Sequence, residues 1–526
     1  HHGSINKETR VWVEQAIRNE SLRAVVCTSS LDLGVDFAPV ETVIQIGGPK
    51  GVARFFQRAG RSGHRPGKES VIYFLPTHAI ELVEASALKK AVATQAVEDR
   101  MPYLNSYDVL VQYLTTLAVS DGFYPGELYE EVRQTFCFQA LSREQWQWIL
   151  NFLVLGSQSL QSYDEYKKVE VEADGRFKVN HRGIALRHRL QIGTIVSDAH
   201  LLVRYQKGGY IGTIEEWFIS KLKTGDVFTF AGRNLEFIRI KEMQVHVRNS
   251  RKKTSKVPSW MGGRLTLSAQ MSQLLREELY SAGMAIGAQS EEIKALKPLF
   301  DKQRIESIVP RPHEFLIETF KTTEGYHHLF YPFEGRFVHE AMGSLLGYRI
   351  SLLAPVTFSL AFNDYGFELL SDKAVDIQQV LDNDLFSPDY MLEDLQKSLN
   401  ATEMARRKFR DIAVISGMVF TGYPKKGVRM KHLQSNSQLL FDVFKDYEPD
   451  NLLYQQAYTE TFEHQLEEGR LRRALERIAR QEVCWKTCQR PTPFSFPIIT
   501  DRLREKLSSE KLADRIRRMA EKLMKR

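Results

Sequence analysis

Short apolar runs alternate with amphipathic segments over the first 80 residues of the chain. Residues 4–18 join a polar start to apolar positions at helical spacing, which predicts a capped amphipathic helix. Continuous apolar runs, typical of buried strands, occur at 23–27, 40–46 and 70–75, with a predicted helix at 53–59. Buried strands that alternate with helices indicate a parallel α/β sheet, and about 80 residues make roughly half of such a domain. We therefore expect upstream strands that this sequence does not contain.

A helical pattern with a late hairpin follows over residues 79–190. Helices are predicted over 124–136 and 142–155, and the run 169–179 has a hairpin turn at Asp174-Gly175. Helices followed by a hairpin are the arrangement of a winged helix. Many small α+β domains share this arrangement, so the pattern by itself leaves that wider class open.

Turns become dense over residues 191–267, where glycine-rich sequences separate short β-prone runs. This spacing predicts a small barrel or sandwich. Beyond it the pattern is helical, then mixed, then helical again to a basic amphipathic end at 501–526. The sequence predicts a multidomain α/β and α+β fold in four parts: a partial parallel α/β lobe at 1–80, a winged helix at 81–190, a β-barrel-like module with flanking helices at 191–300, and a mixed, then helical, C-terminal region at 301–526.

Composition places the chain among ordinary globular proteins of the soluble class. Of its 526 residues 43% are hydrophobic and 26% are charged, and no apolar run is long enough to span a membrane. Four scattered cysteines are too few for a disulfide framework, which favours a reducing, cytoplasmic interior. The net charge of +7 is compatible with a polyanion partner. No secretory leader opens the sequence; residues 1–4 fit a tag remnant by themselves and a native loop in their context.

Two segments carry the chemistry of the first 80 residues: Val25–Asp36 and Gln57–Arg65. In the second, the pattern Gln57-x-x-Gly60-Arg61 places a guanidinium, always charged and with donors in a fixed fork, at the edge of the lobe. Such a group stabilises charge that grows on a transferred phosphoryl group. A basic helix with surface salt bridges is the alternative. The phosphate loop G-x-x-x-x-G-K-[ST], which would hold a nucleotide, does not occur in the sequence.

The loop from Thr28 to Asp36 offers a second kind of contact. Thr28 and Ser29 follow a predicted strand, where hydroxyls and backbone N–H groups can bind a nucleic-acid phosphate. Asp36 can meet a nucleotide sugar or tie the loop to Arg61. A plain strand-to-helix turn with a capping aspartate explains the same residues.

Further nucleic-acid candidates lie in a basic stretch that leads to a tryptophan. Trp260 can stack on a base while cations follow the phosphate backbone; these are Arg248, Arg251, Lys252, Lys253 and Lys256. An exposed basic hairpin with a structural tryptophan is the alternative. No metal site is expected, because His339-Glu340 lacks a second histidine and the pair Cys484 and Cys488 has no second pair nearby.

Taken together, these segments resemble a known family. Val25–Asp36 and Gln57–Arg65 look like motifs V and VI of superfamily 2 helicases, and the variant Q-R-A-G-R-S-G-H-R resembles the large helicase-related (Lhr) proteins. Other stretches agree across nearly the whole chain: Gln191–Ile195, Val257–Trp260, Arg406–Arg410 and Leu440–Phe444. The similarity is greatest to the bacterial subgroup of ligase-associated DEXH-box DNA-damage-response helicases.

The resemblance implies ATP-driven translocation 3′ to 5′ along single-stranded DNA, with displacement of a paired DNA or RNA strand. It implies that residues 1–80 belong to a second RecA-like lobe, and that ATP and Mg²⁺ are held mainly by a first lobe absent from this sequence. The implied roles are catalytic for Gln57, Arg61 and Arg65, nucleotide-binding for Gly34, Asp36, Arg58 and Arg61, and nucleic-acid-binding for His2, Gly3, Thr28, Ser29, Arg251, Lys252 and Trp260. His64 stands where the family has its last arginine, which leaves open whether Arg58 or Arg65 is the second arginine finger.

Two functions therefore compete. The chain is the C-terminal portion of an ATP-dependent helicase that acts in DNA repair and hydrolyses no ATP by itself, or it is a non-catalytic nucleic-acid-binding clamp or scaffold without a motor. The expected partners are single-stranded DNA and DNA or DNA·RNA duplexes, with a DNA ligase and a nuclease by family association only. We expect a monomer in the bacterial cytoplasm, associated with the nucleoid.

Overall fold

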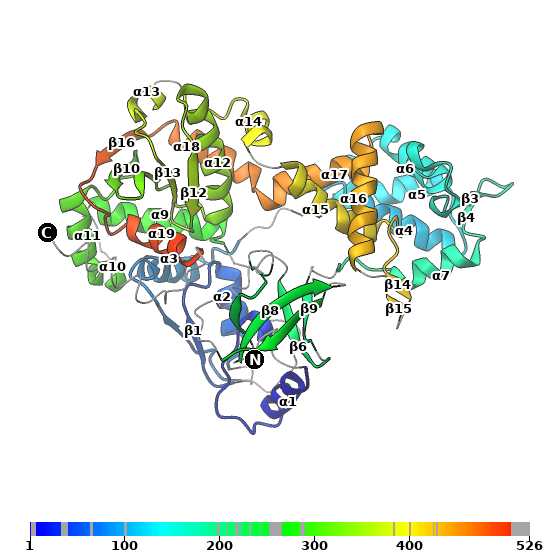
Figure 1. Cartoon of the computed structure of the whole chain (residues 1–526), viewed down its shortest axis with the longest axis horizontal. Coiled ribbons are helices and arrows are strands. Elements are labelled where there is room, and N and C mark those ends of the chain that lie inside the picture. Colours follow the sequence, from blue (N-terminus) through cyan, green and yellow to red (C-terminus); the bar gives the residue numbers. More distant parts are fainter. Residues whose placement is uncertain are drawn as a thin grey trace.

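The structure of the protein is a computed structural model (Figure 1). Its described residues contain a helical body with a small hairpin, a five-stranded sheet with helices that shares a core with the N-terminal helices, and another five-stranded sheet with an apolar cluster of its own. The structure describes all of the chain except residues 2–6, 33–39, 64–66, 99–101, 197–199, 207, 216–218, 220–221, 223, 231–232, 242–243, 252–265, 285–289, 382–383, 399–400, 424–425, 428–429 and 506–526.

The N-terminal segment contains a two-stranded parallel sheet. β1 (Val43–Ile46) pairs in parallel with β2 (Ile72–Leu75), as the two apolar runs predict, and α2 (Val52–Ala59) lies between them in the chain. α1 (Lys7–Arg18) confirms the first predicted helix, and α3 (Glu81–Ala93) follows β2. Because strand residues alternate between faces, one face of this sheet is apolar and exposed; it presents Ile44, Ile46, Tyr73 and Leu75.

The strand predicted at 23–27 is wrong. Val26 is 88% exposed, and the turn η1 (Ser29–Leu31) begins soon after it. The terminal amine of His1 donates to the Val26 carbonyl at 2.6 Å, and the Thr28 N–H donates to the His1 carbonyl at 3.1 Å. An apolar run becomes a strand only beside a neighbour that pairs with it. Within the described residues, β1 and β2 pair with each other and neither pairs with 23–27.

The winged-helix prediction is confirmed. Its elements are α4 (Tyr107–Val119), α5 (Pro125–Arg133), α6 (Arg143–Leu155), the antiparallel hairpin β3 (Glu170–Val171) and β4 (Phe177–Lys178), and α7 (Arg182–Gln191), with short turns η2 (Phe136–Phe138), η3 (Gln158–Leu160) and η4 (Asp164–Tyr166). A capping box starts α6, because Ser142 Oγ accepts from the Gln145 N–H at 3.2 Å and Gln145 Oε1 accepts from the Ser142 N–H at 2.9 Å.

Helices from far along the chain complete the core of this winged helix. These are α15 (Ala401–Ile415), α16 (Met430–Tyr447) and α17 (Leu452–Glu460), and α16 and α17 (orange) lie beside α4–α6 (cyan) in Figure 1. The fully buried rings of Phe409, Phe441 and Phe444 join the same apolar cluster as Leu110, Leu114 and Ile149. The small hairpin β14 (Gly422–Tyr423) and β15 (Lys426–Gly427) projects from this body.

The module predicted at 191–300 contains an open sheet. Its strands are β5 (His200–Tyr205), β6 (Tyr210–Glu215), β7 (Val227–Phe230), β8 (Arg233–Lys241) and β9 (Gln244–Asn249), in the order β6-β5-β9-β8-β7. In the described part of this module, β6 and β7 each pair with one neighbour, so the barrel-like prediction is corrected to an open mixed sheet. Dense turns predict many short strands, but closure depends on pairing between the outermost strands, which periodicity does not specify.

A second five-stranded sheet lies in the C-terminal region. Its strands are β10 (Glu314–Thr322), β11 (Gly325–Phe330), β12 (Phe358–Phe362), β13 (Phe367–Ser371) and β16 (Glu482–Thr487), in the order β12-β13-β11-β10-β16. One face, with Phe315, Ile317 and Phe367, packs on α12 (Arg336–Leu353) and α18 (Glu468–Ile478). β16 pairs in parallel with β10, in a region where the sequence pattern predicts mainly helices.

The other face of this sheet shares a core with the N-terminal helices. Leu316, Phe320 and Leu329 join a cluster that includes Val52 of α2 and residues of α3. The same cluster holds α9 (Ala269–Met284), α10 (Glu291–Ala295), α11 (Lys297–Glu306) and α19 (Ser495–Glu505). The remaining elements are α13 (Ile377–Leu381), α14 (Met391–Ser398) and the π-helical turn η5 (Thr461–Gln465).

Spatial packing cuts across the four segments predicted from the sequence. α3 falls within 81–190 but packs on α9, and α15–α17 fall within 301–526 but pack on the winged helix. The four boundaries stay predictions, since cores formed by distant segments do not define where a domain begins along the chain.

Candidate nucleotide and nucleic-acid site

One aspartate holds both candidate arginines of α2 and its following turn. The Asp32 carboxylate accepts from Arg58 Nε at 3.0 and 3.1 Å and from Arg58 Nη2 at 2.7 Å, while Arg58 Nη1 donates to Gln45 Oε1 at 2.6 Å. Arg61 donates from Nη2 and Nε to the Asp32 backbone carbonyl at 2.7 and 3.2 Å. We call Asp32, Arg58 and Arg61 the arginine anchor. The fork of donors on each guanidinium suits this two-point attachment.

The two arginines differ in the groups that accept their hydrogen bonds. Arg58 and Asp32 form an ion pair whose side chains are each 15% exposed, so Arg58 is largely occupied inside the fold. Arg61 is half-buried, and its described hydrogen bonds go to a neutral carbonyl oxygen. Both guanidiniums are thus attached to Asp32, Arg58 through the carboxylate and Arg61 through the backbone carbonyl, and their catalytic roles stay predictions.

The turn after α2 has little freedom to move. The Ser62 hydroxyl donates to the Ala59 carbonyl at 2.8 Å and accepts from the Val71 N–H at 2.8 Å, and Val40 pairs with Arg61 and Gly63 through its backbone. Gly63 has φ +67°, and a Cβ there would collide with the Glu69 carbonyl. The position of Arg61 is thus fixed by the sheet as well as by Asp32.

Other predicted site residues lie on the surface or outside the described residues. Gln57 is exposed on α2, Thr28 and Ser29 are exposed at the start of η1, and Arg251 is exposed just after β9. The remaining candidates lie outside the described residues: His2, Gly3, Gly34, Asp36, Arg65, Lys252 and Trp260. Their roles stay predictions.

Sequence reasoning missed Asp32. For a tie between the loop and Arg61 it considered only Asp36, which lies outside the described residues, so that prediction stays untested; the Asp32 backbone carbonyl makes a contact of this kind. Asp32 directly follows η1, and the sequence pattern does not predict this turn. A helical turn brings residue 32 back toward α2, which a strand-to-loop interpretation does not predict.

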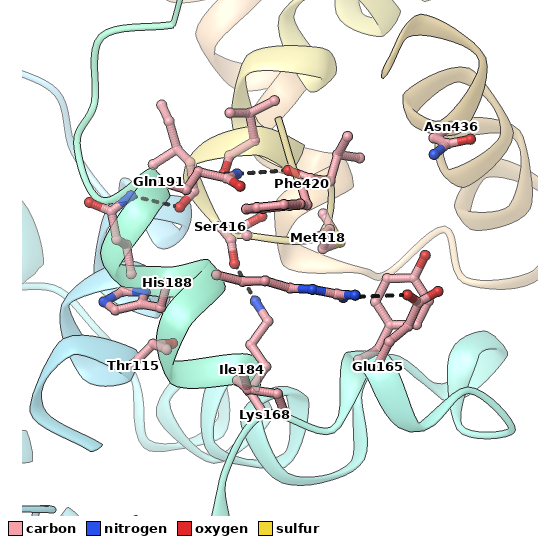
Figure 2. A pocket seen from close by; sticks show the side chains of 17 residues that line it. Thr115, Glu165, Lys168, Ile184, His188, Gln191, Ser416, Met418, Phe420 and Asn436 are labelled. Carbon is pink, nitrogen blue, oxygen red and sulfur yellow. Dashed lines mark hydrogen bonds and ion pairs between the residues drawn. The ribbon is translucent and has the colours of Figure 1, made fainter. Parts of the chain in front are cut away.

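A cavity of about 250 Å³ lies between the winged helix and the turn that follows α15 (Figure 2). Lys168 points into it and donates to the Ser416 carbonyl, beside His188 on α7. Within the described residues, no carboxylate pairs with Lys168, and burial lowers the pKa of this amine to about 7. Burial also lowers the pKa of His188 to about 4, and the charge of Lys168 adds to this effect.

Two glutamines fix the walls of this cavity. Gln191 Nε2 donates to the carbonyls of Val414 and Val419 at 2.6 and 2.7 Å, and Gln112 Nε2 donates to the Ile415 carbonyl at 2.8 Å. At the rim, Arg187 lies 3.8 Å from Glu165 and over the ring of Phe420. The cavity therefore lies at a hydrogen-bonded interface between the winged helix and α15. Its volume is smaller than the ~300–1,000 Å³ of a typical ligand site.

In the described part of the chain, no three His, Cys, Asp or Glu side chains gather closely enough to hold a metal ion. Among the described helices, none combines the length and the apolar character that crossing a membrane requires.

Comparison with protein families matches three parts of the chain. Residues 1–66 match the helicase conserved C-terminal domain, residues 90–257 match the winged helix domain of large helicase-related protein, and residues 309–495 match the DEAD/H associated domain. The first match contains the arginine anchor, and the second contains the winged helix and all five strands of the open sheet.

Curated relatives match along nearly the whole chain. The ATP-dependent helicase Lhr-Core of Methanocaldococcus jannaschii is 26% identical over 95% of this chain and 59% of its own length. The Lhr-Core helicase of Sulfolobus acidocaldarius is 27% identical over 100% of this chain and 62% of its own length. The chain thus spans about 60% of the length of these relatives.

A solved structure shares the fold. The Mycobacterium smegmatis helicase Lhr, bound to single-stranded DNA and AMP-PNP, superposes with a TM-score of 0.68 at 22% identity, over 94% of this chain and 61% of that one. The three domain matches occur in one chain, and the relatives align across it from end to end. The chain belongs to the large helicase-related (Lhr) family of helicases.

Proposed function

We propose that this chain is the C-terminal part of an ATP-dependent 3′–5′ DNA helicase that moves along single-stranded DNA and separates DNA or DNA·RNA duplexes in DNA repair. The observation that carries the proposal is the arginine anchor: a half-buried guanidinium held by a carbonyl oxygen at the end of α2. The names of the relatives, which are ATP-dependent helicases, support it.

In this proposal, ATP supplies the phosphoryl group whose developing charge needs a cation. Arg61 provides that charge from this chain, with its fork oriented in advance by Asp32. Preorientation matters because a guanidinium that must reorganise during the reaction stabilises less charge. ATP and Mg²⁺ are otherwise held by a first lobe, because this sequence has no phosphate loop.

Nucleic acid is proposed to contact two surfaces. Thr28 and Ser29 are exposed hydroxyl residues at the start of η1, where backbone N–H groups and side chains can meet a phosphate. Arg251 lies exposed after β9 at the beginning of the basic stretch that continues to Lys252 and Trp260 in the sequence. The solved relative is bound to single-stranded DNA, which supports this class of partner.

A test compares this chain with a longer version that includes the upstream lobe. We expect this chain to bind single-stranded DNA and to hydrolyse no ATP, and the longer protein to hydrolyse ATP when DNA is added. In the longer protein, Arg61→Ala should reduce turnover by about a thousandfold while DNA affinity stays the same. Arg480→Ala, at an exposed arginine after α18, is the control. Unchanged turnover in Arg61→Ala would reject the finger role.

The alternative, a non-catalytic clamp or scaffold, predicts that the chain binds nucleic acid and that no upstream lobe restores ATP turnover. A ligase or nuclease partner, a monomeric state and a nucleoid location belong to the helicase proposal through family resemblance alone. Sedimentation of the purified protein and co-purification from cells test them separately.

A further inference from the structure

A buried charge cluster lies just before α2. The Lys50 ammonium, with a side chain 16% exposed, contacts Glu84 of α3 at 2.5 Å and Asp364 at 3.5 Å. The Tyr365 hydroxyl donates to the same Glu84 carboxylate at 2.5 Å. Burial lowers the pKa of Lys50, but the charges of Glu84 and Asp364 more than offset it and raise the pKa above its ordinary value. Lys50 is therefore a cation held in place by two carboxylates that are 280 positions apart in the sequence.

Asp364 and Tyr365 belong to the tip of the β12–β13 hairpin, within the DEAD/H associated domain. The turn has a defined shape, because Asn363 Oδ1 accepts from the N–H groups of Tyr365 and Gly366 at 2.9 and 3.2 Å. Gly48 lets the cluster close, since a Cβ there would collide with the Glu84 carboxylate. The hairpin turn and the segment before α2 thus both have the local structure that this contact requires.

The same aspartate also holds the segment that precedes α9. Asp364 Oδ1 accepts from the Leu267 N–H at 3.2 Å and from the Thr266 hydroxyl at 3.4 Å, while Oδ2 faces Lys50. The Ser268 N–H donates to the Lys50 carbonyl at 2.9 Å. In the sequence, residues 266–268 directly follow the stretch that contains Lys252 and Trp260.

A second carboxylate joins this segment to the first turn of α2. Glu98 accepts from the backbone N–H groups of Val52 and Ala53, the latter at 2.7 Å, and from the Ser268 hydroxyl at 2.8 Å. It therefore caps the helix N-terminus, where a negative charge is favourable. α2 has eight residues and a length of ~12 Å, so it connects its capped first turn to Arg58 in its last turn, and Arg61 follows shortly after the helix ends.

We propose that Lys50, Glu98, Ser268 and Asp364, here called the junction, couple nucleic-acid binding to the position of the arginine anchor; the proposal rests on the helicase function proposed above. Within the described residues, the junction joins the segment that leaves the basic stretch directly to the helix that carries the arginines. Its contacts are an ion pair at 3.5 Å and hydrogen bonds to carboxylates at 2.7–3.4 Å, and such contacts depend on distance and angle. Asp364 and Ser268 are positioning residues, and neither is placed at a bound ligand.

The alternative is that the junction only stabilises the fold. Hydrogen exchange in this chain separates the two, since it needs no ATP. We expect a single-stranded oligodeoxynucleotide to slow amide exchange in α2 at least about fivefold in the wild-type chain. Asp364→Asn keeps an oxygen for the Leu267 N–H but removes the charge that faces Lys50, so it should bind the oligonucleotide equally well and leave α2 exchange unchanged on binding. Ser268→Ala, which removes the hydroxyl donor to Glu98, should act in the same direction.

Glu306→Gln is the control, because Glu306 is an ion-paired carboxylate of the same body, bound to Arg490 and Lys302. In the longer protein, Asp364→Asn should lower DNA-stimulated ATP turnover roughly tenfold, with the oligonucleotide Kd within about twofold of wild type. The control should match the wild type in every measurement.

Each outcome decides one proposal. Binding without slower α2 exchange in the wild type, or slowing that Asp364→Asn retains, overturns the junction and leaves the helicase proposal standing. Failure of the wild-type chain to bind single-stranded DNA overturns the proposed function itself and the junction with it. If Asp364→Asn lowers both the Tm and the DNA affinity, the same two quantities are measured for Ser268→Ala. If Ser268→Ala also lowers both, the junction has a purely structural role.

Discussion

At the scale of single residues, two buried ionisable side chains have opposite surroundings. Asp32 has a cation at bonding distance, whereas Lys168 has a backbone carbonyl and no carboxylate partner among the described residues. A buried charge stabilises the fold only when it is paired, so loss of Asp32 should cost stability and loss of the Lys168 charge should not. Sequence reasoning identified neither residue, because burial and pairing depend on contacts between distant segments.

Asp32→Ala should destabilise the chain by ~2–4 kcal/mol, because it leaves the Arg58 guanidinium buried without its carboxylate. The backbone carbonyl that holds Arg61 remains, so in the longer protein turnover should fall less than in Arg61→Ala. Urea denaturation measures the first effect, with Asp301→Ala, at a half-exposed carboxylate, as the control. A change in unfolding free energy below ~0.5 kcal/mol would show that the Asp32–Arg58 pair contributes nothing to the fold.

Lys168 should make stability depend on pH. Its folded pKa of about 7 lies below its ordinary value of 10.5, so between these values the unfolded chain binds one more proton. Stability therefore rises with pH across this window, and at pH 6 the full penalty for charging the buried amine applies. Lys168→Met should remove this slope and raise the Tm more at pH 6 than at pH 9. Lys167→Met, at the half-exposed neighbour, is the control. Equal Tm shifts at both pH values would contradict the assignment.

At the scale of elements, sequence periodicity correctly predicts the helices and strands that depend mainly on their own residues and near neighbours in the chain. The parallel pair β1 and β2, the helices α1, α2 and α6, and the β3–β4 hairpin lie where their apolar runs and turn residues place them. Two predictions are wrong for the same reason: a strand predicted at 23–27 does not form, and strand β16 forms although it was not predicted. One has an apolar pattern without a paired strand beside it, and the other becomes a strand because β10, about 170 residues earlier, offers an edge.

Substitutions in the turn after α2 test how strongly this turn fixes the position of Arg61. Gly63→Ala adds a Cβ that meets the Glu69 carbonyl at a left-handed φ, so it should lower stability by ~2–3 kcal/mol and displace Arg61. Gly67→Ala is a matched control, because Gly67 has φ +77° and open space around its Cα. Its smaller loss, ~1 kcal/mol, measures the backbone strain alone. Equal losses in the two variants would show that the contact with Glu69 is tolerated.

At the scale of the whole molecule, the chain assembles its bodies from distant segments. The winged helix obtains part of its core from α15–α17, and the DEAD/H associated domain shares a core with α2 and α3. The sequence predicted the winged helix and a C-terminal region that mixes strands with a helix, but it did not predict which distant segments share a core, since periodicity shows that a face is apolar and not which element covers it. The sequence also predicted Arg61 as the catalytic cation while missing the junction, whose members are ordinary polar residues without a motif.

If α15–α17 are part of the winged-helix core, a change in α15 must loosen helices some 300 residues earlier. Phe409→Ala removes a fully buried ring that contacts Phe441 and Phe444, which should cost ~3–5 kcal/mol. Because Phe409 shares one cluster with Leu110 and Ile149, hydrogen exchange in α4 and α6 should accelerate while β10 and β11, in another cluster, stay protected. Tyr447→Ala removes an aromatic ring that is 76% exposed on α16 and should change neither. Acceleration confined to α15–α17 would mean that these helices fold as a separate unit, and the winged helix would then hold its core without them.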